Sequence, residues 1–246
     1  MQELQLFKPD WDLPPQVAAF VTGRAGGVSK NEFASLNVAH HVGDIPASVD
    51  RNRAIVREAF PDATRWQWLD QVHGNSVHVV TEAGEDLQGD ALVTREKGLA
   101  CCVMTADCLP LFVASNSGDE IAIVHGGWRG LAAGIVENTI QAMDNEPATL
   151  SAYLGPAIGP DHFEVGPEVR AAFLALQDSA EMEQQFQPAG AKFYADLYGI
   201  SRLLLAAAGV TRVSGGSHCT FRDADSFYSY RRDGQTGRML NAIYIR

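Results

Sequence analysis

Two histidines and one cysteine have the residue types of a catalytic zinc site. His73 lies in the segment QVHG, Cys108 in TADCLP and His125 in IVHGGWRG. Each lies at the end of an apolar run, where side chains from different strands can converge at one edge of a sheet. A catalytic zinc ion commonly takes three protein ligands and keeps a fourth position for water or substrate. These residue types make His73, Cys108 and His125 candidate ligands of one zinc ion.

The spacing of these residues leaves another interpretation open. The separations of 35 and 17 residues match no short metal-binding signature. Taken singly, His73 could satisfy a turn, Cys108 could pack as a small apolar group, and His125 could cap a following helix. In a catalytic role, Cys108 and His125 would act at the reacting centre itself.

The segment GGWRG predicts an anion site beside His125. Gly126 and Gly127 lie between a strand and a helix, where glycine allows a ligand to approach the backbone. Arg129 could add two donors to a phosphate or carboxylate. The alternative is that the two glycines only make room for Trp128 and for packing of the helix.

Asp107 precedes Cys108 directly. Its carboxylate could act as a general base or could orient a ligand histidine, and a turn-capping role is the alternative. Asn37, with His40, His41 and Asp44, could form a further polar wall for a ligand.

The C-terminal segment HCTFRDADSFYSYRRDG is rich in arginine and tyrosine. Through Arg222 and its neighbours it could bind an anion or stack on a base. A structural, solvated tail is the alternative.

Strands and helices alternate around these residues without a regular βαβ repeat. Paired strands are predicted at 89–94 with 98–105, and a hairpin at 109–115 with 120–127. These runs are apolar almost throughout, which indicates strands covered on both faces. The predicted helices are 48–60, 127–144, 167–177 and 196–209, the last closed by Gly209. This order predicts an α/β (α+β) fold with mixed sheets flanked by helices, in one domain over residues 1–246.

Composition limits the binding partners and the cellular compartment that we expect for this protein. The net charge of -11 disfavours general nucleic-acid binding, since an acidic surface repels phosphate backbones. The first residues lack the basic start and apolar run of a secretory signal, so we expect none, and no apolar run is long enough for a membrane helix. Three of the four cysteines lie within eight positions and two are adjacent, which favours reduced thiols. We expect a cytoplasmic protein that acts on small molecules.

Six motifs resemble those of one family: QVHG, GDALVT, TADCLPLF, VHGGWRGLAAGI, LGPAIGP and HCTFRDADSFYSYRRDGQTGR. From about GRAGGVS to its end, the chain resembles the YfiH-like proteins. These are also described as laccase-domain or multicopper polyphenol oxidase proteins, as purine nucleoside phosphorylases and as peptidoglycan editing factors. The resemblance implies a layered α/β fold shared with the catalytic domain of cytotoxic necrotizing factor. It also implies that His73, Cys108 and His125 are the metal ligands.

The resemblance implies zinc-dependent chemistry on purine nucleosides. The implied reactions are phosphorolysis of adenosine, inosine and methylthioadenosine, and deamination of adenosine. Zinc could activate water for attack at purine C6, or position phosphate for attack at ribose C1′.

A true laccase mechanism conflicts with the histidine count. A multicopper array needs many histidines, several of them in His-x-His pairs, and this chain has seven histidines and no such pair. One copper ion at the same three ligands could still oxidise phenols.

Two further functions remain open. A Cys–His hydrolase or amidase that edits peptidoglycan precursors would use Cys108 as nucleophile and His125 as base. A metal-binding protein without a reaction would close the site with a fourth ligand, such as Cys219 or His218.

Overall fold

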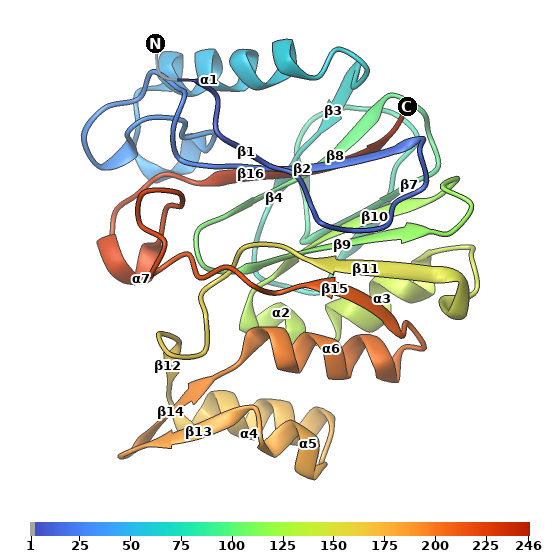
Figure 1. The fold of residues 1–246 in the computed structure, drawn as a ribbon, viewed down its shortest axis with the longest axis vertical. Coiled ribbons are helices and arrows are strands. Elements are labelled where there is room, and N and C mark those ends of the chain that lie inside the picture. Colours follow the sequence, from blue (N-terminus) through green and yellow to red (C-terminus); the bar gives the residue numbers. More distant parts are fainter. Residues whose placement is uncertain (1–2) are drawn as a thin grey trace.

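Two large sheets lie face to face in the computed structural model, which describes residues 3–246 (Figure 1). In order, the first sheet contains β1 (Leu6–Phe7), β2 (Val17–Thr22), β16 (Met239–Ile245), β8 (Leu99–Thr105) and β3 (Arg65–Gln67). The second contains β15 (Arg212–Gly215), β11 (Leu150–Leu154), β9 (Leu109–Ser115), β10 (Ile121–Gly126), β7 (Ala91–Thr94) and β5 (Val77–Val79). Both sheets combine parallel and antiparallel pairs, so the mixed α/β class predicted from the sequence is confirmed.

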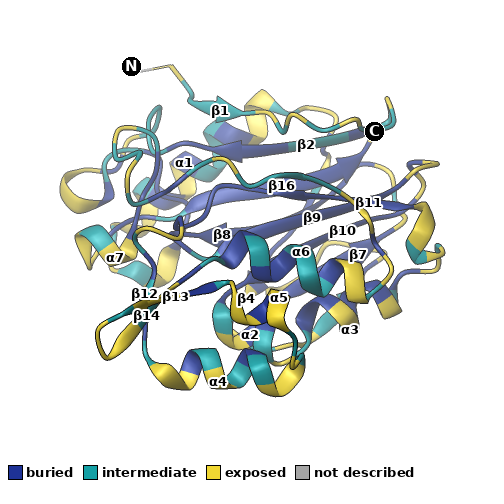
Figure 2. Cartoon of the chain, turned by 60° about the horizontal axis from the view of Figure 1, so that its bottom comes forward, coloured by how far each residue is buried: buried dark blue, intermediate teal, exposed yellow. Residues whose placement is uncertain are grey.

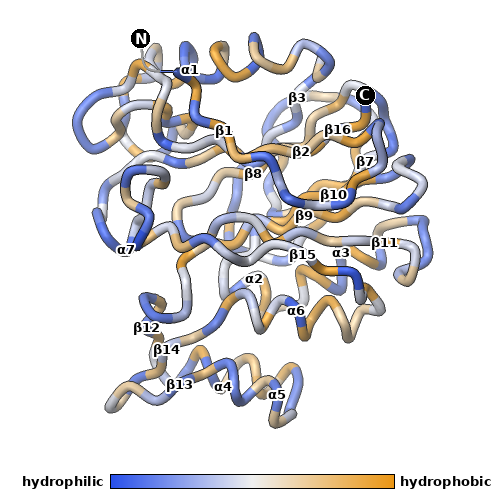
Figure 3. Tube along the Cα trace, in the orientation of Figure 1, coloured by the Kyte–Doolittle hydropathy of each residue, from blue (hydrophilic) through white to orange (hydrophobic). Residues whose placement is uncertain are grey.

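Alternation along β8 builds two cores at once. Cys101 and Val103 join the core between the two sheets, whereas Cys102 and Met104 join the core beneath α1 (Pro46–Ala59). Successive side chains of a strand point to opposite faces, so the adjacent cysteines cannot pair with each other. All four cysteines are free thiols. The prediction that these apolar strands are covered on both faces is confirmed, and Figures 2 and 3 show the central strands as buried and hydrophobic.

The predicted pairing of 89–94 with 98–105 is wrong. The two segments became β7 and β8, which lie in different sheets; β7 pairs with β10 and β5, and β8 pairs with β16 and β3. Leu92 of β7 and Leu99 of β8 both belong to the core between the sheets. Both strands are apolar on both faces. The same apolar pattern therefore fits two strands packed face to face in different sheets as well as two strands paired in a hairpin. The hairpin of β9 with β10 is confirmed.

Helices cover the outer face of the second sheet. They are α2 (Trp128–Ala132), α3 (Ile135–Ala142) and α6 (Leu197–Ala207). The single helix predicted at 127–144 is divided into α2 and α3, because Gly134 adopts a left-handed conformation at φ 88° between them. The end of α6 agrees with the prediction, with Gly209 left-handed just beyond it at φ 87°.

A smaller unit projects below these helices in Figure 1. It contains α4 (Pro167–Leu176), α5 (Ala180–Glu183), β12 (Glu164–Val165), β13 (Phe186–Ala189) and β14 (Lys192–Ala195), and its helix α4 packs against α2. The remaining elements are β4 (Leu69–Asp70), β6 (Leu87–Gln88), α7 (Tyr230–Asp233) and the 3-10 helices Asn31–Phe33, His40–Val42 and Pro147–Thr149. Among residues 3–246, none of the helices has the length and apolar character that a membrane crossing needs.

Candidate metal centre and active-site cavity

The loop that contains His73 is anchored on one buried carboxylate. Asp90, immediately before β7, accepts the backbone N–H groups of His73 at 3.0 Å and of Gly74 at 2.7 Å. Its side chain has no exposed surface. His73 adopts a left-handed φ of 58°, which costs a non-glycine residue conformational energy and is found mainly where the surroundings enforce it. The hydrogen bonds to Asp90 hold the backbone in this conformation, and they thereby fix the position from which the exposed His73 side chain extends.

The same carboxylate orients His125. His125 lies in β10 next to Asp90 across the sheet, and its Nδ1 is 2.7 Å from Asp90 Oδ1. Burial alone would raise the pKa of Asp90, but hydrogen bonds from His125 and from the Gly74 backbone outweigh it and lower that pKa. An ionised Asp90 requires a proton on Nδ1, so Nε2 is the nitrogen that can bind a metal. Burial acts to lower the pKa of His125, but the charge of Cys108 and the hydrogen bond with Asp90 raise it to about 9, so a metal would replace a proton on Nε2.

Cys108 lies where the chain crosses from β8 in the first sheet to β9 in the second. Its Sγ and one ring nitrogen each from His73 and His125 all lie within 4.8 Å of one another. Burial raises the pKa of the Cys108 thiol, but the charge of His125 and hydrogen bonds from both histidines overcome this effect and lower it to about 6. The structure therefore brings the three predicted ligands together, with the thiol largely ionised at neutral pH.

This donor set fits a zinc ion. One thiolate and two imidazoles are typical zinc ligands, and three protein ligands leave a coordination position open. Gly127 lies against the cluster: a Cβ there would be 2.9 Å from Cδ2 of His73 and 3.3 Å from Sγ of Cys108. Any side chain at this position would displace a ligand. Within residues 3–246, no other group of three His, Cys, Asp or Glu side chains meets the same distance limit.

The predicted anion site at Gly126–Arg129 is not assembled in the cavity. A Cβ on Gly126 would lie 2.8 Å from the Leu109 carbonyl oxygen, so this glycine is needed for packing on β9. The exposed Arg129 guanidinium lies 4.5 Å from the Trp128 ring centroid and does not line the cavity described below. The two glycines therefore make room for the strand and the metal ligands.

A cavity of about 420 Å³ opens over the cluster. This volume lies within the range of roughly 300–1,000 Å³ typical of small-molecule sites. Besides the cluster, its polar lining includes His41, Asp107, Arg231 and Arg238. Met104, Ile158, Phe163 and Tyr230 supply apolar and aromatic surface. A metal site that opens on cationic and aromatic walls is suited to a ligand with both an anionic group and a ring.

Asp107 connects the cluster to the C-terminal segment. It lies in the cavity wall at a left-handed φ of 92°, and its carboxylate accepts the Thr220 hydroxyl at 2.6 Å and the Arg231 backbone N–H at 2.7 Å. The orienting role on a ligand histidine, considered for Asp107, falls instead to Asp90. Asp90 follows Gly89 at the start of an apolar strand, and a lone acid in that position was the signal that could have identified it.

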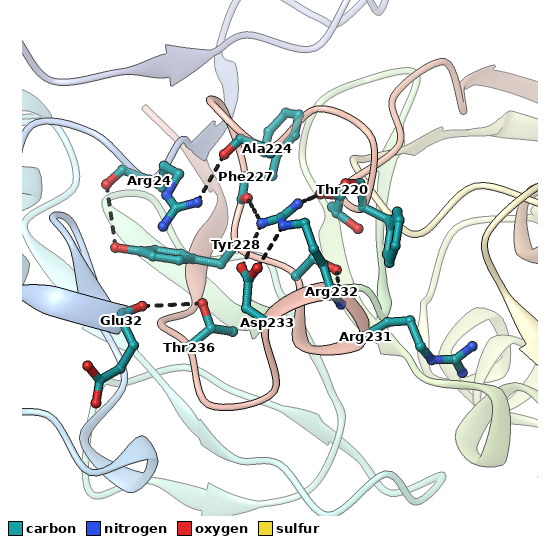
Figure 4. Close-up of polar contacts among 12 residues, drawn as sticks. Arg24, Glu32, Thr220, Ala224, Phe227, Tyr228, Arg231, Arg232, Asp233 and Thr236 are labelled. Carbon is teal, nitrogen blue, oxygen red and sulfur yellow. Dashed lines mark hydrogen bonds and ion pairs between the residues drawn. The ribbon is translucent and has the colours of Figure 1, made fainter.

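The C-terminal loop is built around Arg232, with Arg231 pointing away from it (Figure 4). Arg232 donates to the carbonyl groups of Thr220, Phe221 and Phe227 and pairs with Asp233. Its donors are therefore used within the loop. The Arg231 guanidinium donates once, to the Glu164 carbonyl at 2.9 Å, and keeps further donors for a ligand.

Asn37 and Arg222 do not reach the cavity. Asn37 is fully buried, and its Oδ1 accepts the backbone N–H groups of Ala39 and Arg238, both at 3.0 Å. It positions the wall and does not contact a ligand in the cavity. Arg222 is exposed, pairs with Asp223 at 2.8 Å, and lines a separate shallow hollow beside His218.

Sequence reasoning did not assign Arg238 or Tyr230, and it gave His41 only as part of a polar wall. Arg238 lies in QTGR at the start of the last strand, and nothing in its spacing distinguishes it from a surface arginine. The arginine- and tyrosine-rich C-terminal segment did indicate this part of the wall, through Tyr230 and Arg231 rather than Arg222.

A larger hollow of about 580 Å³ lies between α3 and α6. Its lining includes Leu131, Ile140 and Leu204, with Glu137 and Asp144 at the rim, and no histidine or cysteine. Within the described part of the chain, its carboxylates form no group of three metal-binding side chains with one another, whereas the smaller cavity contains the His73, Cys108 and His125 cluster and is the candidate active site.

Comparison with known proteins gives the family. The family model described as "Multi-copper polyphenol oxidoreductase laccase" matches residues 18–246. This chain belongs to that family. A purine nucleoside phosphorylase of Pseudomonas aeruginosa is 46% identical over 240 residues, covering 97% of each chain. The purine nucleoside phosphorylase YfiH of Escherichia coli is 43% identical over 242 residues, covering 98% of this chain and 99% of YfiH.

Solved structures agree with the fold. A Neisseria meningitidis protein of family DUF152 matches with a TM-score of 0.94 at 43% identity, covering 98% of this chain and 99% of that one. YlmD from Geobacillus stearothermophilus matches with a TM-score of 0.88 at 32% identity, covering 94% and 93%. The resemblance to YfiH-like proteins drawn from the motifs is therefore confirmed.

Proposed function

We propose that this chain is a zinc-dependent purine nucleoside phosphorylase. Its substrates would be adenosine, inosine and methylthioadenosine with phosphate, and it would also deaminate adenosine. The observation that carries the proposal is the cluster of His73, Cys108 and His125 at a cavity whose wall includes Arg231 and Arg238. The names of the curated relatives support the same reaction.

The metal would be held by His73, Cys108 and His125. When bound there, it would supply a Lewis acid for a substrate oxygen and an activated water for deamination. Asp90 holds one proton of His125 on Nδ1, so that Nε2 is the nitrogen available to a metal, and it fixes the His73 loop. The protein residues thus set the ligand geometry before metal and substrate arrive.

Arg238 and Arg231 would bind phosphate. Burial lowers the pKa of Arg238, while the charges of Cys108 and Asp107 act to raise it. The Arg238 guanidinium is therefore near enough to the cluster to feel its charge. A guanidinium binds a phosphate with paired donors, and phosphate bound here would lie beside the metal ligands. This assignment replaces the site expected at Gly126–Arg129.

Aromatic surface would bind the purine. Tyr230 is exposed at the cavity and Phe163 lines it under the Arg231 side chain. Such rings stack on heterocycles without reading their substituents, which suits an enzyme that accepts more than one purine.

A Cys–His hydrolase acting on peptidoglycan precursors is the second candidate. The lowered pKa of Cys108 and its contact with His125 favour a thiolate nucleophile. Its activity would survive chelation and be lost on alkylation of the thiol. The alternative of a closed, non-catalytic metal site has less support, because the Sγ of Cys219 instead contacts His162 Nδ1 at 3.6 Å and accepts the Gly159 N–H.

The test combines metal analysis with a phosphate-dependent assay. Zinc-loaded protein with adenosine and phosphate should yield adenine and ribose 1-phosphate, and omission of phosphate should abolish both. Cys108→Ala should remove the metal and the activity together. Lack of turnover at full zinc occupancy would refute the proposal. Phosphorolysis that persists after chelation would refute its zinc dependence, and cleavage of a peptidoglycan precursor that survives chelation and is lost on thiol alkylation would favour the hydrolase.

A further inference from the structure

His41 presents an imidazole to the cavity with no described partner. It lies on the 3-10 helix His40–Val42 and lines the same cavity as Cys108. No hydrogen bond or ion pair joins its ring to another residue of the described part of the chain, 3–246. The adjacent His40 differs: it does not line the cavity, and its Nε2 pairs with Asp50 at 3.2 Å. Of the two neighbouring histidines, only His41 can meet a ligand in the cavity.

A buried polar network fixes the backbone that bears His41. Asn37 accepts the N–H groups of Ala39 and Arg238 and donates to the Ala39 carbonyl at 3.1 Å. Asn52, itself fully buried, donates to the Asn37 carbonyl at 2.7 Å. Buried amides remain in proteins when their hydrogen bonds are satisfied, and satisfied networks rigidify their surroundings. Asn37 therefore holds the loop of His41 and the strand of Arg238 as one wall of the cavity.

The proposed phosphorolysis needs an acid that the metal cluster does not provide. A purine leaves poorly as an anion, so cleavage of its bond to ribose is assisted by protonation of the base. The metal ligands and the arginines are committed to the metal and to phosphate. A cationic histidine on the wall that holds Arg238 would have the proton that the base requires.

We propose that His41 is a catalytic residue that protonates N7 of the leaving purine; this inference rests on the proposed function. A phosphate oxygen forms a bond to ribose C1′ as the C1′–N9 bond breaks. The electron pair of that bond passes into the base, which takes the proton of the His41 imidazolium at N7. The proton that phosphate loses on becoming ribose 1-phosphate returns to His41 through solvent, so the cycle conserves protons.

The charges around His41 set the direction of its pH dependence. Burial lowers its pKa most, the charges of Arg238, Arg53 and His40 lower it further, and the charge of Asp70 raises it, with a net lowering. A lower pKa makes the imidazolium a stronger acid and reduces its population at neutral pH. Turnover of neutral nucleosides should therefore fall as pH rises through this pKa.

The test compares inosine with 7-methylinosine, whose base already carries the positive charge that protonation would create. In zinc-loaded protein, His41→Gln should lower kcat for inosine by about 100-fold or more, within the usual contribution of a general acid. It should also remove the fall in kcat at rising pH, and it should leave turnover of 7-methylinosine near that of the wild type. His40→Gln on the same 3-10 helix is the matched control and should change neither substrate.

Three results would count against the inference. Equal losses for both substrates would mean that His41 only supports the structure, and unchanged turnover of inosine would mean that it has no role. Both results overturn the inference while the proposed function stands. If the wild type phosphorolyses neither nucleoside, the proposed function fails and the inference fails with it. His41 is exposed, so the glutamine variant should fold, and its zinc content and melting temperature verify this directly.

Discussion

Asp90→Asn is expected to weaken the metal site while leaving its three ligands in place. The Asp90 carboxylate accepts four groups: the ring Nδ1–H of His125 and the backbone N–H groups of Val72, His73 and Gly74. Asparagine has one acceptor oxygen, and its NH₂ group would face at least one of these donors. A buried donor left unsatisfied costs about 1–3 kcal/mol, which is the expected loss of folding stability.

The effect on the metal should be larger than that on the fold. Asparagine no longer requires the proton on Nδ1 of His125, and loss of such a partner typically weakens metal binding about 10- to 100-fold. Competition between the protein and a chromophoric chelator measures zinc affinity, and thermal melting of the metal-free protein measures stability. Asp225→Asn, the same substitution at an exposed acid, is the control. A folded Asp90→Asn protein with wild-type zinc affinity would refute the role assigned to Asp90.

Three further outcomes follow from the site. Arg238→Ala should raise KM for phosphate roughly 10- to 100-fold, the equivalent of about 1.5–3 kcal/mol for hydrogen bonds to a charged group, whereas Arg51→Ala on the surface of α1 should not. In metal-free protein, iodoacetamide should modify Cys108 rapidly at pH 7 and progressively more slowly below pH 6, because the pKa of about 6 leaves less thiolate at the lower pH. Bound zinc should protect Cys108 from this modification. Gly127→Ala should reduce zinc affinity about tenfold or more, since its Cβ would lie 2.9 Å from His73; wild-type affinity would contradict this packing role.

The sequence predicted the metal ligands better than the walls of the cavity. The residue types made His73, Cys108 and His125 candidate ligands, and the resemblance of the motifs around them to one family then favoured a metal site over separate structural roles. The arginines depend on a fold that brings residue 238 beside residue 37, a contact without any local pattern. Arg129 was expected at the site because it is near His125 in sequence, but its side chain packs on Trp128 instead.

The errors in the fold have a similar cause. A strand that is apolar on both faces can pair side by side with its neighbour in one sheet. It can equally well pack face to face against a strand of a second sheet. The pattern of β7 and β8 therefore left their relation open, and the short connection between them favoured the wrong choice. The division of α2 from α3 depends on one left-handed glycine, which helical periodicity does not detect.

The cluster also limits what the family description can mean for this chain. A multicopper oxidase passes electrons between several copper ions, whereas within residues 3–246 only one group of three ligands meets the distance limit. Its thiolate and imidazoles also suit copper, which exceeds zinc in the usual order of affinities. Phenol oxidation by this chain would thus require copper at His73, Cys108 and His125. Because zinc would need the same three side chains, oxidation and phosphorolysis would be alternative states of one site, and the metal supplied would decide between them.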